Sequence, residues 1–188
     1  MTPRFSASFS AADAGPVRSA AIVEWLDSAE CRDLDDADMV AGLACRLRAG
    51  DLPLDRLVLH LRTLHPEVLG RAVVWALGRP VEVYDRDFGI EFSADFPGSP
   101  VHRVMESGQP LMVRPGWVVG PGWTWPEVFR GHGLTELFIV PLGMADGPAR
   151  TLSFCTRQPM GFSAADRDSL ACLLPILRQV CDRRFRAD

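Results

Sequence analysis

The clearest hydrophobic pattern in the chain is a pair of alternating runs between residues 54 and 78. Three leucines alternate with other side chains over residues 57–62, and small and large apolar side chains alternate over residues 72–77. Period-two alternation places the two sets on opposite faces of a strand. Pro66 favours extended backbone at His65, and Gly70 permits the positive φ of a turn, so the two runs are predicted to form an antiparallel hairpin.

Apolar residues at helical spacing predict helices at both ends of the chain. Pro16 suits the first turn of a helix whose apolar positions include Ile22, Trp25 and Leu26. A second helix follows, with aspartates at its N-terminal end and Gly50 as its stop. Near the C-terminus, Ser163 and Asp166 cap a long helix in which Pro175 is expected to introduce a kink. Residues 1–15 are expected to form a flexible N-terminus.

Shorter elements are predicted between the two ends. Ser99 and Pro100 favour the start of a helix that ends at Gly108. Residues 81–92 are ambiguous between short strands and an excursion of the chain, and Asp146-Gly147 is a turn signal. Strands are expected at residues 110–113, 137–140 and 151–156.

This order of elements predicts one α+β domain over residues 16–188. Consecutive hairpins indicate a central antiparallel sheet. Helices from both termini are expected to pack together on one face of the sheet, and loops plus a short helix are expected to cover the other face.

Composition restricts the environment and the partners of the domain. Of the 188 residues 47% are hydrophobic, enough for a well-developed core, and the net charge of −4 favours neither nucleic acid nor an anionic membrane as a partner. No apolar run approaches the ~20 residues of a membrane span, and the N-terminus lacks the apolar region of a secretory signal. We therefore expect a cytoplasmic protein. Five cysteines without a CxxC pair argue against a disulfide framework and a structural zinc site.

The most unusual stretch is residues 114–126, where three tryptophans stand among glycines and prolines. It is predicted to be a loop, followed by a short helix for which Thr124 and Glu127 have capping-box spacing. Two interpretations of this Trp-rich loop stay open. Its rings either complete the core as a lid over the sheet, or they line a pocket or a partner-binding surface.

A second polar region lies in the loop of the predicted hairpin. Arg62, Thr63, His65 and Arg71 are close together in the sequence there. They form either a solvated turn, in which Thr and His hydrogen-bond the backbone, or a polar cluster at the mouth of a pocket or at a subunit contact.

Several segments together resemble a known family. Residues 62–75, RTLHPEVLGRAVVW, look like a segment of the N-terminal regulatory domain found ahead of the catalytic domain in a group of bacterial class III adenylate cyclases. Four later segments follow in the same order: Ser99-Pro100-Val101, Gly133-Leu134-Thr135-Glu136, Ile139-Val140-Pro141-Leu142 and Pro159-Met160-Gly161-Phe162-Ser163. The resemblance runs from about Ile22 to the C-terminus.

That regulatory domain is similar to GAF domains, which are small-molecule and interaction modules built on a central antiparallel sheet. The resemblance therefore implies a GAF-like fold with a regulatory role. The sequence departs from the family because it ends at Asp188 with no cyclase domain after the regulatory one. We therefore expect no cyclase activity from this chain.

No combination of residues in the sequence indicates a reaction. The four histidines lack the spacing of a metal site, and there is no GxSxG elbow or phosphate-binding loop. His65 and His132 could serve as axial ligands of haem, although lone histidines are more often structural. Cys155 near Arg157 could act as a nucleophile, but a strand cysteine more often packs as a small hydrophobe.

These observations favour a non-catalytic GAF-like sensory or regulatory module that forms a homodimer, with no metal and no cofactor predicted. A small molecule or a protein partner would bind near the Trp-rich loop, and the terminal helices would transmit the signal. A standalone protein-interaction module without a pocket is the alternative, followed by a haem-binding sensor or a small Cys/His enzyme. The candidate ligand-binding residues are Arg62, His65, Trp75, Trp117, Trp123, Trp125, His132, Phe138 and Phe154.

Overall fold

A computed structural model describes residues 14–62, 68–87, 96–114, 122–124, 132–143 and 150–187. Residues 1–13 of the expected flexible N-terminus, the turn at Asp146-Gly147, most of the Trp-rich loop and the short helix predicted after it lie outside the described residues. Ala14 and Gly15, expected to be flexible, already belong to the first helix. None of the described helices is long and apolar enough to cross a membrane.

Six strands form one sheet in which every neighbouring pair is antiparallel, in the order β3-β2-β1-β6-β5-β4. The predicted hairpin is confirmed as β1 paired with β2, in a register that sets Arg56 opposite Ala76 and Arg62 opposite Gly70. The second predicted strand pair is confirmed as β5 and β6. The strands are β1 (Arg56–Arg62), β2 (Val68–Ala76), β3 (Glu82–Asp87), β4 (Leu111–Val113), β5 (Glu136–Pro141) and β6 (Arg150–Thr156).

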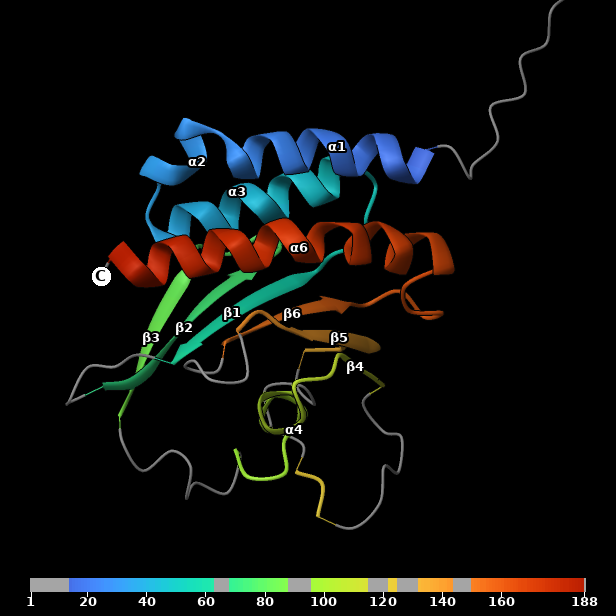
Figure 1. Cartoon of the computed structure of the whole chain (residues 1–188). Helices are drawn as coiled ribbons and strands as arrows, with labels where there is room; N and C mark the ends of the chain where they lie inside the picture. The colour runs from blue at the N-terminus through green and yellow to red at the C-terminus, as the bar shows by residue number, and fades with distance from the viewer. Residues whose placement is uncertain are drawn as a thin grey trace, which may run out of the picture.

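The N- and C-terminal helices pack together on one face of the sheet, as predicted (Figure 1). Four helices lie together on one face, which we call the helix-side face: α1 (Ala14–Asp27), α2 (Ala29–Asp33), α3 (Asp36–Ala49) and α6 (Ala164–Ala187). The short helix α4 (Pro100–Ser107) lies on the opposite face, which we call the α4 face. The chain is therefore an α+β protein with an antiparallel sheet between two unequal layers.

Alternation along the strands assigns each side chain to one of these faces. On β1 the leucines, among them the fully buried Leu57 and Leu59, join the large core of the helix-side face with Phe154 of β6. A smaller core lies on the α4 face, where Val101 and Val104 of α4 pack against Leu137 and Ile139 of β5. Both faces of β5 are therefore covered, as its continuous apolar run predicts.

Local capping signals are also confirmed. The Ser99 hydroxyl accepts a hydrogen bond from the His102 amide at the start of α4, and Gly108 ends the helix with a positive φ of 64°. At the start of α6, the Ser163 hydroxyl and the Asp166 carboxylate bond to each other's backbone amides, as in a capping box. Helix α6 continues through Pro175.

Two features differ from the sequence-based expectation. The first helix stops at Asp27, because the Ser28 side chain accepts from the Cys31 amide and starts the separate short helix α2. The ambiguous stretch after the hairpin contains an edge strand, β3, whose partner β2 includes a register shift between Val68 and Gly70.

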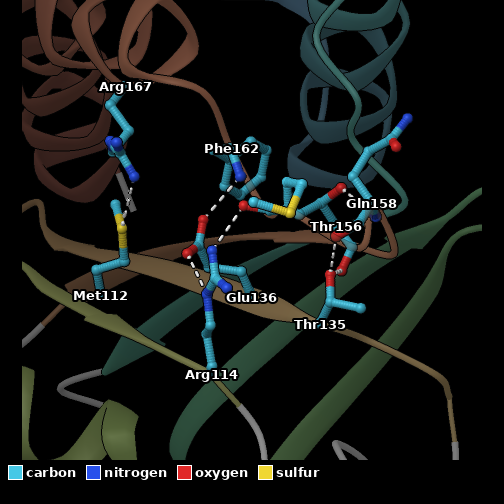
Figure 2. Close-up of polar contacts among 9 residues, drawn as sticks. Met112, Arg114, Thr135, Glu136, Thr156, Gln158, Phe162 and Arg167 are labelled. Atoms are coloured by element: carbon cyan, nitrogen blue, oxygen red, sulfur yellow. Dashed lines mark hydrogen bonds and ion pairs between the residues drawn. The ribbon is translucent and has the colours of Figure 1, made fainter.

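A buried carboxylate at the start of β5 binds the segment that connects β6 to α6 (Figure 2). Glu136 of β5 is only 2% exposed and accepts from the Arg114 Nε at 3.0 Å and from the Phe162 amide at 2.7 Å. Arg114 also donates to the Met160 carbonyl at 2.6 Å. Gly161, with φ of 74°, passes so close that an added Cβ would lie 2.4 Å from Glu136 Oε2. Two segments noted separately in the sequence, 133–136 and 159–163, therefore meet here, and we call this contact the Glu136 latch.

The C-terminal end of α6 is attached to the N-terminal helices through two arginines. Arg183 forms an ion pair of 2.9 Å with Asp27 at the end of α1. Arg184 donates to the carbonyl oxygens of Cys31 and Leu34 at 2.7 and 2.8 Å. These bonds satisfy carbonyl groups that the short helix α2 leaves without helical partners. The basic residues predicted to suit the end of this helix thus bind other helices.

Candidate functional site

The central part of the α4 face has an apolar floor bordered by polar side chains. Val58, Ala72 and Val74 of β1 and β2 form the floor, and each is at most 5% exposed. On β6, Thr151 and Ser153 point to the same face, since they pair with His60 and Val58 of β1. A mostly apolar surface with a few converging polar groups is the usual character of a small-molecule site.

One polar group on this face, the Ser153 hydroxyl, lacks a partner among the described residues. The Thr151 hydroxyl lies 3.4 Å from Nδ1 of His60. The Ser153 hydroxyl is buried and has no hydrogen-bond partner among the described residues. Buried hydroxyl groups in folded proteins are nearly always hydrogen-bonded, so this one is a point at which a bound molecule or water would gain a bond.

A small pocket lies at one end of the same face, where β1 begins, β2 ends and β3 begins. It opens between the β2–β3 turn and the residues that follow β6, and its volume is about 20 Å³. We call it the arginine pocket, after its polar lining residues, which are Asp55, Arg56, Arg79, Glu82, His132 and Arg157.

The environment of the arginine pocket lowers the pKa of its histidine, His132. Burial lowers the pKa of His132 below 6.5, and the nearby charges of Arg56, Arg79 and Arg157 lower it further. The neutral imidazole of His132 therefore predominates at pH 7.

Three of the predicted site residues lie on the opposite face of the sheet. Trp75, Phe138 and Phe154 all belong to the helix-side core, and Phe154 is fully buried there. The rings of Phe138 and Phe154 stack with centroids 6.3 Å apart. The alternation that assigns Leu57 to this core also places Phe154 there, because the two residues are paired across β1 and β6.

Trp123 is the member of the Trp-rich loop that the structure describes. Its ring is partly buried against the small core of the α4 face, and the Arg103 guanidinium lies 4.3 Å from the ring centroid. Arg103 in turn donates to the Gly122 carbonyl at 2.8 Å. This ring therefore helps to cover α4, in keeping with the interpretation of the loop as part of the core.

The remaining predicted residues are only partly described. His132 lies in the arginine pocket. Arg62 is the last residue of β1. His65, Trp117 and Trp125 lie outside the described residues. The structure thus separates the predicted set into helix-side core residues, one residue that covers α4 and one in the arginine pocket.

The described thiols do not gather into a reactive group. Burial raises the pKa of Cys155 to about 12, and that of Cys181 also to about 12. Burial also raises the pKa of Cys31. Cys45 and Cys172 are exposed, on α3 and α6. Across the described ranges there is no group of three or more His, Cys, Asp or Glu side chains able to hold a metal ion.

Sequence reasoning missed Arg56, Arg79 and Ser153. Arg56 follows the period-two pattern, which assigns it to the face opposite Leu57, so its place on the α4 face could have been predicted from register. Arg79 stands in the β2–β3 turn, and nothing in its local sequence marks it. Ser153 alternates with apolar strand residues, and only the pairing of β6 with β1 brings it to the centre of the sheet.

Comparison with protein-family models finds no match, and a search of curated proteins finds no related sequence. Solved structures do match. A GAF domain from an Acinetobacter phosphoenolpyruvate-protein phosphotransferase aligns with a TM-score of 0.64 and 15% identity, covering 96% of this chain and 98% of that chain. The phycoerythrobilin-bound GAF domain of a cyanobacterial phytochrome aligns with a TM-score of 0.57 and 13% identity, over 89% and 96% of the two chains.

A catalytic protein is also among the matching structures. The free methionine-R-sulfoxide reductase of Neisseria meningitidis, solved with its substrate, aligns with a TM-score of 0.58 and 16% identity, covering 100% of this chain and 99% of that chain. Identities this low establish the architecture alone. The strand order, the shared layer of N- and C-terminal helices and these alignments show that the chain has the GAF fold.

Proposed function

We propose that the protein is a non-catalytic GAF-like sensory or regulatory module that binds a small molecule on the α4 face of its sheet. The observation that carries this proposal is the buried, unpaired hydroxyl of Ser153 beside the apolar floor of Val58, Ala72 and Val74. The likeness to GAF domains supports it, since one of them binds phycoerythrobilin. The ligand would contact Ser153 and His60.

Ion pairs offer a route from the sheet to the terminal helices. The Arg150 side chain at the start of β6 is 5% exposed, and its Nη1 lies 2.9 Å from the Asp182 carboxylate on α6. Arg183, the next residue along α6, pairs with Asp27 of α1. A ligand that changes the position of β6 would therefore act on α6 and α1, in proportion to its difference in affinity for the two states.

Native mass spectrometry and an absorption spectrum of the purified protein test the ligand-binding part. We expect a bound small mass, or binding from a metabolite screen, that is weakened by Ser153→Ala. Ser169→Ala is the matched control, because its hydroxyl donates within α6, to the Ala165 carbonyl at 2.8 Å. A Soret band would identify haem. A ligand-free mass with no hit in the screen would contradict the proposal and favour the protein-interaction module.

We also propose that the module is a homodimer, in which the terminal helices lie close to the partner subunit. The exposed face of α6 includes Ala171, Cys172 and Pro175, and the neighbouring helix α1 exposes Ala20 and Ala21. Small side chains of this kind let two helices approach closely. Light scattering is expected to give twice the chain mass, and a monomer at high concentration would remove this part of the proposal. Association with an adenylate cyclase stays an expectation from the sequence resemblance.

The likeness to a methionine sulfoxide reductase favours one further function, a thiol-dependent reductase. Such chemistry needs a thiolate near the bound substrate. The thiol on the α4 face, Cys155, is fully buried with its pKa raised to about 12, so it stays protonated at neutral pH. We expect no reduction of free methionine sulfoxide in the presence of excess dithiol. Turnover that Cys155→Ser abolishes would reverse this assignment.

A further inference from the structure

The charges lining the arginine pocket are unevenly matched. Arg157 is neutralised by Asp55, since its Nη1 lies 3.6 Å from the carboxylate and its backbone amide donates to the same carboxylate at 2.7 Å. The Nε of Arg157 also donates to the His132 carbonyl at 2.8 Å. Asp55 is therefore already engaged and leaves the other two arginines of the pocket unneutralised.

Arg56 and Arg79 have no ion-pair partner among the described residues. The Nε of Arg56 is buried and has no hydrogen-bond partner in the described part of the chain. Glu82, the second carboxylate of the pocket, accepts a hydrogen bond from the Tyr84 hydroxyl and lies within salt-bridge distance of neither arginine. A buried N–H donor without an acceptor is costly, because it has lost its hydrogen bond to water and gained none in exchange.

We propose that the arginine pocket binds the carboxylate group of a small organic acid, held by Arg56 and Arg79. Guanidinium groups present parallel N–H donors that match the two oxygens of a carboxylate. The carboxylate would supply the acceptor that the Arg56 Nε lacks. Neutral His132 would line the site and could donate one further hydrogen bond.

The size of the pocket decides which part of a ligand it takes. A volume of about 20 Å³ holds a group of a few atoms, whereas whole organic ligands occupy roughly 300–1,000 Å³. The pocket therefore accommodates the acid group only. The rest of the molecule would extend along the α4 face, over Val74, which lines both the pocket and the apolar floor. In this respect the inference rests on the proposed function, and it assigns the chemical class of the ligand.

The lowered pKa of His132 is consistent with a positive electrostatic potential in the arginine pocket. The arginines that lower the pKa of His132 are Arg56, Arg79 and Arg157, of which Asp55 neutralises only the last. The same positive potential attracts a carboxylate. The charge, the buried donor and the dimensions of the pocket thus agree on one ligand class.

The test is a titration with sodium acetate, followed by the NMR signals of the arginine Nε–H groups at constant ionic strength. We expect the Arg56 signal to shift and saturate. Arg79→Gln should weaken acetate binding at least about tenfold, because it removes a charge-assisted bond. Arg79 is exposed, so this variant is expected to fold even if Arg56→Gln does not. Arg32→Gln is the matched control, because it removes an exposed arginine far from the pocket.

Three outcomes would overturn the assignment. A shift that grows linearly with acetate and is the same in Arg79→Gln would show only screening of surface charge. Saturation by inorganic phosphate but not by acetate would exclude the carboxylate class. No shift of the Arg56 signal, in a protein that still binds a ligand through Ser153, would exclude the pocket while leaving the proposed function intact.

Discussion

At the scale of single residues, Gly161 is a position where both the backbone conformation and the neighbouring atoms disfavour any side chain. It combines a φ of 74° with an approach that would set a Cβ 2.4 Å from Glu136 Oε2. Any side chain there meets both the penalty of left-handed backbone and a contact with the buried carboxylate. Glu136 could move only by giving up its bonds to Arg114 and the Phe162 amide.

We therefore predict that Gly161→Ala lowers the free energy of unfolding by about 3 kcal/mol. The matched control is Gly78→Ala. Gly78 has a φ of 75°, but nothing lies within 4 Å of its added Cβ, so only the backbone term of about 1 kcal/mol applies. Urea denaturation of the two variants measures the difference. Equal losses of unfolding free energy in the two variants would mean that the Glu136 side chain moves aside at no measurable cost.

At the scale of elements, the attachment of α6 to α1 can be followed through one carboxyl group. The hydrogen bond from Arg183 is the largest cause that lowers the pKa of Asp27 below 3.8, and its charge adds to the effect. Arg32 is also near Asp27, at 3.9 Å, and its charge contributes less. The pKa of Asp27 therefore reports whether the ion pair between the two terminal helices is formed.

We predict that Arg183→Ala raises the pKa of Asp27 toward 3.8, and that Arg32→Ala raises it less. Because the folded-state pKa is depressed, the ion pair stabilises the protein above about pH 4, and this contribution is lost as the pH falls through the folded-state value. The stability difference between wild type and Arg183→Ala should shrink in the same window. Carboxyl chemical shifts from NMR measure the pKa. An unchanged value in Arg183→Ala would show that the ion pair between Arg183 and Asp27 does not form in solution.

At the scale of the whole molecule, the sequence predicts the features that depend on residues close together in the chain. Both hairpins, the helix caps at Ser99 and Ser163 and the two-layer arrangement follow from local patterns, and the structure confirms them. Pairing across the sheet centre does not follow from local patterns. Leu57 meets Phe154 because β6 happens to lie beside β1, and nothing near either residue encodes that choice.

The candidate site illustrates the same limit. Trp75 and Phe154 were predicted to bind a ligand because they are large aromatic residues. The alternation of side chains along their strands instead places them in the helix-side core. The arginine pocket draws Arg56, Arg79, His132 and Arg157 from four separated segments. A site of this kind is assembled by the sheet, so it becomes visible only once the strand order is known.

The pairing of β1 with β6 at the centre of the sheet leads to a prediction about how the molecule unfolds. Phe154 is fully buried where β1, β5 and β6 meet, and it packs in the same core as Trp25 and Trp75 of the N-terminal half. Loss of its ring should therefore affect both halves of the chain at once. We predict that Phe154→Ala lowers the free energy of unfolding by about 3–5 kcal/mol. Tryptophan fluorescence and far-UV circular dichroism should shift together to the same lower urea midpoint.

Met160→Ala is the control for this change, because Met160 lies six residues away and its side chain is 81% exposed. Removing it should alter the free energy of unfolding by no more than about 0.5 kcal/mol. The tryptophans lie in both halves of the chain, so their fluorescence reports on both. If Phe154→Ala instead gave different urea midpoints by fluorescence and by circular dichroism, the sheet would not unfold as one cooperative unit, and the coupling of its two halves through β1 and β6 would be excluded.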